Sequence, residues 1–309
     1  MNGTMVKIGV IGIGDIALKA YLPVLCSRKD VELHVFTRNA DTLELVGQKY
    51  RIKHLHHTLE ALLESGLQAA FVHAATDAHY EIVEKLLQHN IHVYVDKPIT
   101  YHYSASRELV ELAEKQHLLL MVGFNRRYAP ANQRLMEVPE PNMVLMQKNR
   151  KALPAAVRTF ILDDFIHVVD TLLYLFPYPI KHLIVNGKRE GDLLYHVTVQ
   201  FVADNGAIAI GIMNRDSGTV EERVEVMHAS QKRVVINMTD LLIYEGKSEQ
   251  LVKFNDWDTT LYKRGFEPIV EEFIGVVTSG SIPANSANEA LYTHEICERI
   301  VEQLYASEA

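Results

Sequence analysis

The chain has 309 residues, of which 48% are hydrophobic and 23% charged; this provides for two ordinary domain cores and excludes intrinsic disorder. Its formal net charge of -8 makes nucleic acid an unfavourable partner, because an acidic surface repels phosphate. The two cysteines, Cys26 and Cys297, form no ligand motif, so we expect neither a disulfide framework nor a zinc site. No apolar run approaches the roughly 18 residues of a membrane-spanning helix and no signal peptide is evident, so we expect a cytoplasmic protein without a membrane partner.

The first part of the chain alternates short apolar runs with amphipathic segments of helical period. Helices are predicted at Tyr80–His89 and Ser104–Gln116. Strands buried on both faces are predicted at Val6–Ile11, Glu32–Phe36, Ala69–His73, His92–Val95 and Leu118–Val122. Strands joined by helical crossovers form a doubly wound parallel sheet, so we predict an α/β fold with a Rossmann dinucleotide-binding domain over residues 1–124.

The pattern changes after about Asn125. A linking helix is predicted over residues 128–137, and an apolar helix over Asp163–Phe176. Alternating residues predict strands at Met143–Lys148, His196–Val202, Ala207–Met213, Val220–Met227 and Arg233–Met238. Asp204-Asn205-Gly206 is a hairpin turn signal, and Ser286 with Glu289 forms a capping box for a C-terminal helix reaching about Leu304. We therefore predict a second domain of α+β type over residues 125–309.

A glycine-containing turn follows the first predicted strand. Gly12-Ile13-Gly14-Asp15-Ile16-Ala17 has the GxGxxA pattern, in which the first glycine allows a tight turn and the second lets a pyrophosphate approach the backbone. The phosphates would lie against the N-terminus of the following helix. The alternative is a glycine-rich turn without a ligand. Placement between a strand and a helix favours binding of NAD or NADP.

The end of the second strand bears on the choice of cofactor. An acid at this point would bind the ribose hydroxyls of NAD, but this sequence has Thr37 and Arg38. A guanidinium suits the 2′-phosphate of NADP, so the sequence favours NADP. The alternative is an ordinary surface arginine.

Two further segments carry candidate catalytic side chains. Asp96-Lys97-Pro98 closes a strand at the ligand-binding edge of the sheet, where Lys97 could give a proton or hydrogen bond to a substrate oxygen; a solvated lysine is the alternative. Asp163, His167 and Asp170 are spaced i, i+4, i+7 on one face of an apolar helix, which suits acid–base chemistry. A buried ion pair is the alternative there, and a metal site has too few ligands.

A second group of histidines lies outside these segments. His54, His56 and His57 are closely spaced after a short strand, but no acidic residue near them in the sequence completes a metal site. We therefore interpret them as exposed polar residues and predict no metal in this protein.

These motifs together resemble the glucose–fructose oxidoreductase/inositol dehydrogenase/MocA (Gfo/Idh/MocA) family. The matching residues are Gly12–Ala17, Thr76 with His79, Asp96-Lys97-Pro98, Gly123–Tyr128 and the Asp163/His167/Asp170 pattern. The resemblance implies a C-terminal domain with an open, mostly antiparallel sheet that serves substrate binding and oligomerisation. It implies a homodimer or homotetramer and a dehydrogenase or reductase acting on a CH–OH group of a sugar, polyol or related small molecule.

The resemblance also implies roles for particular residues. His167 would act as acid or base on the substrate, assisted by Lys97, and Asp163 would orient that pair. The expected cofactor-binding residues are Gly12, Ile13, Gly14, Asp15, Ile16, Thr37, Arg38, Ala75, Thr76, His79, Asp96, Lys97 and Asn125.

Two departures from the family pattern leave the substrate open. The family often has two glycines before the catalytic aspartate, whereas this chain has Arg158–Leu162, and the segment Asn149–Leu162 is compact. One alternative is a cofactor-binding regulatory protein without turnover. Another is a reductase of a non-sugar C=O, C=N or C=C bond.

Overall fold

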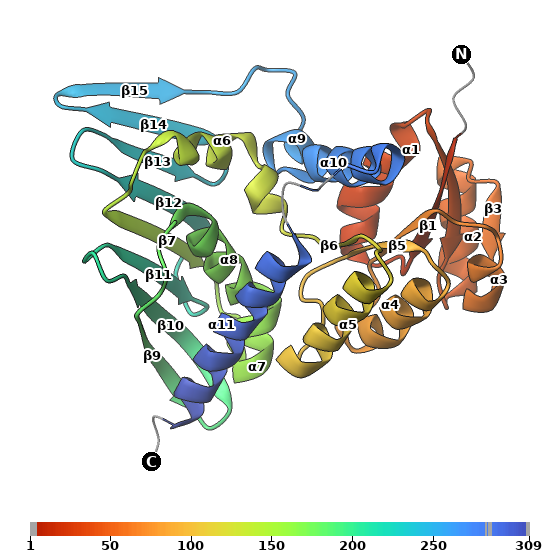
Figure 1. The fold of residues 1–309 in the computed structure, drawn as a ribbon. Helices are drawn as coiled ribbons and strands as arrows, with labels where there is room; N and C mark the ends of the chain where they lie inside the picture. Colours follow the sequence, from red (N-terminus) through yellow and green to blue (C-terminus); the bar gives the residue numbers. More distant parts are fainter. Residues whose placement is uncertain (1–4, 282, 284–285, 307–309) are drawn as a thin grey trace. The chain divides into compact units, whose positions relative to one another are not determined.

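The computed structural model describes residues 5–281, 283 and 286–306. The chain forms two compact units (Figure 1). Unit 1 comprises Met1–Gly123 and Phe266–Leu291, and unit 2 comprises Phe124–Gly265 and Tyr292–Ala309. In the described residues, no helix is both long and apolar enough to cross a membrane.

Unit 1 contains the predicted parallel sheet. Its strands are β1 (Val6–Ile11), β2 (Val31–Phe36), β3 (His54–His56), β4 (Ala69–Val72), β5 (His92–Val95) and β6 (Leu120–Val122). They pair in the order β3-β2-β1-β4-β5-β6, with every pair parallel. The order reverses between β1 and β4, and doubly wound sheets bind ligands beyond the carboxyl ends of the strands at such a point. The Rossmann prediction is confirmed.

Unit 1 also contains helices, some of which begin at a capping side chain. They are η1 (Ala17–Tyr21), α1 (Leu22–Ser27), α2 (Ala40–Tyr50), α3 (Leu59–Leu63), η2 (Thr76–Ala78), α4 (His79–Gln88), α5 (Tyr103–Lys115) and α10 (Phe266–Ser279). Asn39 caps α2 and Thr58 caps α3, each by accepting a backbone N–H three residues ahead. In α4 the buried residues Val83, Leu86 and Leu87 follow the helical period. Helices α4 and α5 match the predicted segments to within a residue at each end.

Helix α10 belongs to unit 1, although it lies late in the sequence (Figure 1). The ring of Phe273 packs edge-on against Phe71 and Tyr94, with centroids 5.0 and 5.5 Å apart, and Phe266 packs against Tyr21 at 5.4 Å. These rings complete the aromatic core of the parallel sheet. The prediction placed all of residues 125–309 in one domain. In the structure, residues 266–291 belong to unit 1, because α10 packs on the aromatic core of the parallel sheet.

Unit 2 is built on a large mixed sheet. Its strands are β7 (Met143–Asn149), β8 (Ala155–Ala156), β9 (His182–Glu190), β10 (Leu193–Val202), β11 (Ile208–Asn214), β12 (Glu221–Met227), β13 (Lys232–Ile236), β14 (Asp240–Glu245) and β15 (Ser248–Val252). They pair in the order β15-β14-β13-β12-β7-β11-β10-β8, and β9 also pairs with β10. Strands β7 and β11 are parallel and the other described pairs are antiparallel. Gly206, with a φ of +83°, makes the predicted turn between β10 and β11. The mostly antiparallel sheet is confirmed.

Unit 2 also contains helices, the last of which, α11, begins in the final residues of unit 1. They are η3 (Asn125–Tyr128), α6 (Pro130–Gln133), η4 (Arg134–Glu137), α7 (Val157–Thr159), η5 (Phe160–Phe165), α8 (Ile166–Leu175), α9 (Thr260–Lys263) and α11 (Ala287–Ala306). Helices α8 and α11 lie on the same side of the strands (Figure 1). A Cβ on Gly211 of β11 would lie 2.9 Å from both Val168 and Leu172, so this glycine allows α8 to pack closely. The Oγ of Ser286 accepts the N–H of Glu289, as the capping box predicts.

Two predicted helices differ from the structure. The linking helix over residues 128–137 is broken into the short pieces η3, α6 and η4, because Pro130 lacks an N–H and begins a new helix at its first position. The helix over Asp163–Phe176 is a π-helical turn, η5, followed by α8. Sequence periodicity does not reveal a π-helical turn, because a single wide turn shifts the period only locally.

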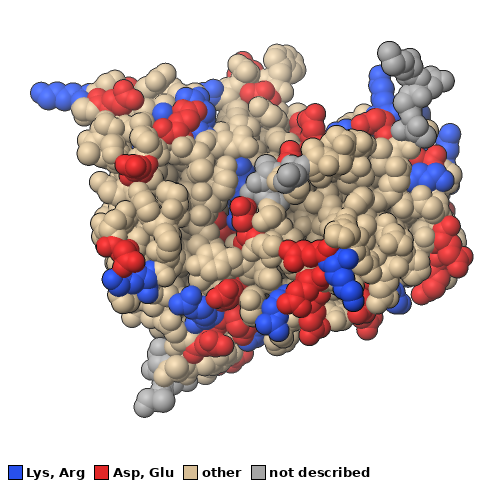
Figure 2. Space-filling view, in the orientation of Figure 1, with Lys and Arg blue, Asp and Glu red and all other residues tan. Residues whose placement is uncertain are grey.

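The surface carries charged side chains of both signs, as expected from 39 acidic and 31 basic residues. Figure 2 shows acidic and basic side chains interspersed on the face in view, with no broad basic area among the described residues there. Nothing on this face suggests a nucleic-acid surface.

Candidate active site

The glycine turn in unit 1 is fixed by its neighbours. Gly12 has a φ of +85°, and a Cβ there would lie 2.5 Å from the Cα of Ala74, so no other residue fits without moving the backbone. Its N–H donates to the carbonyl of Phe36, 3.0 Å away. At Gly14, by contrast, the nearest atom to a Cβ among the described residues beyond its chain neighbours is the carbonyl oxygen of His73, at 3.9 Å. Gly12 therefore serves the turn, whereas Gly14 leaves open space where a ligand can approach.

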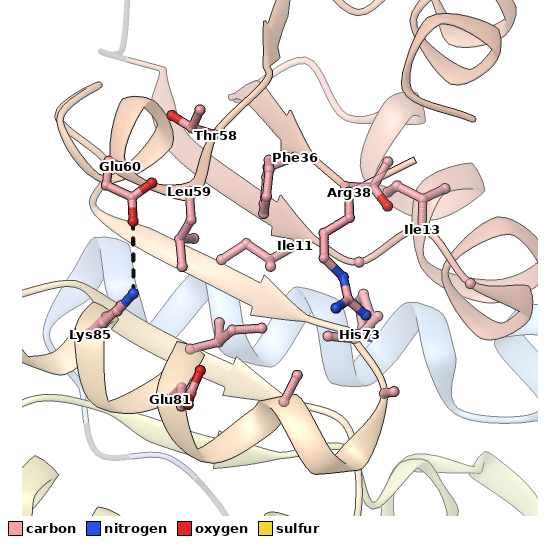
Figure 3. Close-up of a pocket in the computed structure, with 17 residues that line it drawn as sticks. Ile11, Ile13, Phe36, Arg38, Thr58, Leu59, Glu60, His73, Glu81 and Lys85 are labelled. Carbon is pink, nitrogen blue, oxygen red and sulfur yellow. Dashed lines mark ion pairs between the residues drawn. The ribbon is translucent and has the colours of Figure 1, made fainter. Parts of the chain in front are cut away.

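A pocket of about 480 Å³ opens beside this turn (Figure 3). It lies at the carboxyl ends of β1, β2 and β4, at the switch point of the sheet. Its volume is in the range of small-molecule and cofactor sites. The lining residues are Ile11, Gly12, Ile13, Gly14, Phe36, Thr37, Arg38, Thr58, Leu59, Glu60, His73, Ala74, Ala75, Ala78, Glu81, Ile82 and Lys85. Six predicted cofactor residues are therefore together in one pocket: Gly12, Ile13, Gly14, Thr37, Arg38 and Ala75.

The charged side chains of the pocket are divided between its ends. Arg38 follows β2 and lies at one end of the pocket in Figure 3, while Glu60 and Lys85 lie at the other. The Nζ of Lys85 is 3.8 Å from the Oε1 of Glu60, and both side chains are exposed. A cation at the end of β2 is where an adenosine 2′-phosphate would need one.

His73 is a pocket residue that the sequence analysis did not identify. It directly follows β4, is buried, and neither of its ring nitrogens has a hydrogen-bond partner among the described residues. Burial, with a smaller contribution from His79, lowers the pKa of His73 to about 3, so the ring is neutral at physiological pH. An unsatisfied buried donor and acceptor in the wall of a pocket suits a polar ligand.

These observations fit a dinucleotide. The open face of Gly14 suits a pyrophosphate, Arg38 suits a phosphate on the ribose, and His73 offers hydrogen bonds that nothing in the described residues takes up. The residues present therefore match the requirements of a nicotinamide cofactor.

His79, a predicted cofactor residue, lies beside this pocket and makes hydrogen bonds within the protein. It is buried, with Nδ1 3.0 Å from the carbonyl of Pro98 and Nε2 3.0 Å from the carbonyl of Ala74. It does not line the pocket. Its imidazole instead connects the segments after β4 and β5, which fixes the backbone around Lys97 and Pro98.

The remaining predicted cofactor residues lie outside this pocket. Lys97 follows β5 in unit 1, and its backbone N–H donates to the Asp96 carboxylate, 3.0 Å away. Asp15 pairs with Lys19 on the surface, and Asn125, in unit 2, donates to the carbonyl of Arg264 at 2.8 Å. Other predicted residues outside the pocket are Ile16 and Thr76. Contact of these residues with a cofactor stays a prediction.

The candidate catalytic residues of unit 2 lie around the start of α8. Asp163 is in the π-helical turn η5 and is half-buried, whereas His167 is in α8 and is buried. The carbonyl of His167 accepts the hydroxyl of Thr171 at 2.8 Å. Asp163 and His167 thus belong to unit 2 and Lys97 to unit 1.

Asp170 has a structural role. Its carboxylate accepts from Nε and Nη2 of Arg127, at 3.1 and 2.7 Å, and from the hydroxyl of Thr293 at 3.2 Å. Burial raises the pKa of the Asp170 carboxyl, and the Arg127 guanidinium opposes that shift. For this member of the predicted stripe, the buried ion pair is therefore the correct interpretation.

The neighbouring aspartate, Asp164, forms an ionic cluster that the sequence analysis missed. Its carboxylate pairs with Lys148 of β7, accepts from Nε of Arg150 at 3.1 Å, and lies 4.0 Å from Nε of Arg215. The Arg215 guanidinium also lies over the ring of Phe160, 5.0 Å from its centroid. Burial disfavours the carboxylate, but Lys148 and Arg150 outweigh it and hold the pKa of Asp164 well below its ordinary value.

Lys148 is the buried centre of this cluster. Burial, with the nearby charge of Arg126, lowers the pKa of Lys148 to about 7. Arg126 in turn makes a two-pronged ion pair with Glu222, with both N···O distances 2.8 Å. One signal could have revealed the cluster: Lys148 occupies an inward position of an alternating strand, after Val144 and Met146.

Comparison with known proteins agrees with this geometry. The sequence model described as "Oxidoreductase family, NAD-binding Rossmann fold" matches residues 6–124, and that described as "YceM-like, C-terminal domain" matches residues 127–246. The chain is 22% identical over 309 residues to a myo-inositol 2-dehydrogenase of Thermotoga maritima, covering 92% of this chain and 91% of that one.

Two solved structures are similar over almost their whole length. A Gfo/Idh/MocA family oxidoreductase from Vibrio cholerae is 33% identical, with a TM-score of 0.89 and coverage of 97% of this chain and 99% of that one. A dehydrogenase (MviM) from Clostridium difficile is 32% identical, with a TM-score of 0.90 and coverage of 96% and 99%. The resemblance found in the sequence is confirmed, and the chain belongs to the Gfo/Idh/MocA family of oxidoreductases.

Proposed function

We propose that this protein is a dehydrogenase or reductase that transfers a hydride between a nicotinamide cofactor and a hydroxyl or carbonyl carbon of a sugar, polyol or related small molecule. The pocket beside Gly14, with His73 and Arg38 in its lining, is the observation that carries the proposal. The relative from Thermotoga maritima, a myo-inositol 2-dehydrogenase by name, supports the polyol class. When bound, the nicotinamide would supply or accept the hydride.

Two side chains are proposed to act on the substrate, and a third is proposed to act on one of them. His167 would exchange a proton with the reacting oxygen, because an imidazole can act as a general acid or base. Burial of His167 in α8 would hold the ring in one orientation for this transfer. Lys97 would donate a hydrogen bond to the same oxygen, and the carboxylate of Asp163 would favour the protonated imidazole.

We further propose that NADP is preferred over NAD. Support comes from Arg38, which lines the pocket directly after β2 and Thr37. A guanidinium forms paired, charge-assisted hydrogen bonds with a phosphate, whereas the unmodified ribose of NAD offers it no charge.

The cofactor proposal is tested by titrating the protein with NADPH and with NADH while following cofactor fluorescence. We expect saturable binding of both and a lower Kd for NADPH. Circular dichroism would establish that the protein is folded. A folded protein that binds neither cofactor would contradict the proposal.

The catalytic proposal is tested by assaying sugars and polyols with His167→Asn. We expect turnover to fall by about 100-fold or more, the usual contribution of a general acid or base, with the cofactor Kd unchanged. His182→Asn is a matched control, because His182 is an exposed histidine in the same unit. Full turnover in His167→Asn would contradict the assigned role.

The same assays separate the competing functions. Cofactor binding without turnover of any substrate would favour a regulatory protein. Turnover of a non-sugar C=O, C=N or C=C substrate, and of no sugar or polyol, would favour the other reductase class.

A further inference from the structure

A group of polar side chains lies on one face of the edge of the parallel sheet, away from the cofactor pocket. Glu32 and His34 alternate along β2, and His54 and His56 alternate along the edge strand β3. The strands pair in parallel with His34 opposite His54. Since side chains two residues apart point to the same face of a strand, this register places all four together.

Three of these side chains offer ligand atoms to one point. The Nε2 of His34 is 3.0 Å from the Oε1 of Glu32, and the Nε2 of His54 is 3.9 Å from the same oxygen. One ligand atom from each of the three residues lies within 4.8 Å of the other two. The rings of His34 and His54 are stacked, with centroids 4.4 Å apart.

The fourth side chain, that of His56, contacts the ring of His34. The Nε2 of His56 lies 3.0 Å from the Nδ1 of His34. When His34 binds an ion through Nε2, its proton is on Nδ1 and is donated to His56. Metal-binding histidines usually donate their other N–H to such a partner, which fixes the tautomer and the orientation of the ring.

We propose that Glu32, His34 and His54 bind a divalent transition-metal ion such as Zn²⁺, with His56 as the hydrogen-bond partner of His34. Two imidazole nitrogens and a carboxylate oxygen are ligands that Zn²⁺ uses, and a water would complete the coordination. Ligands about 2.1 Å from one ion are at most about 4.2 Å apart, so side-chain shifts of roughly half an ångström close the site.

The exposure of the three side chains suits an ion arriving from solvent. The side chain of His34 is 5% exposed, that of Glu32 27% and that of His54 42%. Glu32 and His54 also line a pocket of about 290 Å³. An ion would therefore meet the exposed ligand His54 first and the buried ligand His34 last.

The sequence analysis predicted no metal here because it searched for acidic residues near His54 in the sequence. Glu32 is 22 positions earlier, and the parallel pairing of β2 with β3 brings it alongside. The proposed site is independent of the proposed function, since none of Glu32, His34 and His54 lines the cofactor pocket.

The test is calorimetric titration of the tag-free, chelator-treated protein with Zn²⁺. We expect one ion per chain, and an affinity at least about tenfold lower in His54→Ala and in Glu32→Gln. His57→Ala is the matched control, because His57 is an exposed histidine next to the cluster and not part of it. It should bind Zn²⁺ like the unaltered protein.

Titration with Co²⁺ gives a second readout, because coordination by imidazole changes its visible absorption. The band should be present in the unaltered protein and in His57→Ala and lost in His54→Ala. The proposal is overturned if the unaltered protein binds no Zn²⁺, or if His54→Ala and His57→Ala bind it with equal affinity. Circular dichroism of each variant would exclude unfolding as the cause of any loss.

Discussion

The imidazole of His73 stacks on the phenol ring of Tyr21, with the two centroids 4.0 Å apart and the planes 29° from parallel. The Tyr21 hydroxyl in turn lies 2.8 Å from that of Tyr94, and both rings are fully buried. The wall of the cofactor pocket is thus continuous with the aromatic core beneath it. Protonation of His73 would therefore change the stability of the sheet.

The first prediction concerns pH. The unfolded chain binds a proton at His73 below about pH 6.5, whereas the folded ring stays neutral to about pH 3. Stability is therefore lost as the pH falls from 6.5 towards 3, by up to ~1.4 kcal/mol per pH unit. His73→Phe should reduce this slope in denaturant titrations, and His57→Phe, an exposed control, should not. Equal slopes in the unaltered protein and His73→Phe would contradict the assignment.

The second prediction separates two roles of glycine. Gly12 and Gly66 both have a positive φ, but a Cβ on Gly12 meets the backbone of Ala74, whereas a Cβ on Gly66 meets no described atom within 4 Å. Gly66→Ala should cost about 1–2 kcal/mol from the backbone conformation alone. Gly12→Ala should cost more and weaken NADPH binding. Thermal unfolding and fluorescence titration would check this, and equal effects of the two changes would contradict the close-approach argument.

The third prediction concerns cofactor choice. Arg38→Ala should weaken NADPH binding about 10- to 100-fold, the range for hydrogen bonds to a charged group, and change the Kd of NADH little. Lys49→Ala is a matched control, because Lys49 is an exposed cation on α2 outside the pocket. An equal loss for the two cofactors would remove the argument for NADP.

The fourth prediction concerns the ionic cluster of unit 2. Asp164→Asn leaves Lys148 and Arg150 without their carboxylate, which should cost about 3–5 kcal/mol at neutral pH. The folded-state pKa of Asp164 is lowered, so the stability it contributes is present above about pH 4 and is lost as the pH falls further.

Denaturant titrations from pH 7 down to pH 3 would check both statements. The difference between the unaltered protein and Asp164→Asn should narrow below pH 4. The control Asp204→Asn removes an exposed pair with Lys181 and should cost at most about 1 kcal/mol. A gap that is constant with pH would show that Asp164 does not titrate as described.

The fifth prediction concerns assembly, where we propose a homodimer or homotetramer. Leu145 of β7 and Ile210 of β11 are opposite each other and half-exposed, on the sheet face turned away from α8. Ile210→Glu should lower the mass measured by light scattering after size exclusion. Leu45→Glu changes an exposed apolar residue of α2 and should not. A monomeric unaltered protein would contradict the proposal.

Local signals in the sequence were sufficient to predict six of the residues that line the pocket beside Gly14. The turn at Gly12 and Gly14 depends on backbone conformation and on its place between a strand and a helix, and both can be read from a short segment. Arg38 was found in the same way, because the end of β2 occupies a fixed place in this fold. His73 was missed, since a histidine at the end of an apolar strand does not by itself distinguish a pocket wall from a core position.

Features that depend on distant contacts could not be predicted. Asp163 and Asp164 are adjacent, and only the tertiary structure shows that Lys148 and Arg150 pair with the second. Likewise, Glu32 is brought to His54 by strand pairing rather than by sequence spacing. In each case the partner is at least 14 positions away in the sequence. Periodicity can mark a residue such as Lys148 as inward-facing, but it does not identify the partner.

The return of α10 to unit 1 has a consequence for biosynthesis. Phe266 and Phe273 complete the core around Tyr21 and Phe71, so a nascent chain released only to Gly123 has every strand of the parallel sheet but lacks this helix. The ribosome must extend the chain past Ser279 before the nucleotide-binding half can close its core. A fragment ending at Gly123 would therefore expose aromatic surface and depend on chaperones, and an internal deletion that joins β6 directly to α10 would return this helix to the fragment.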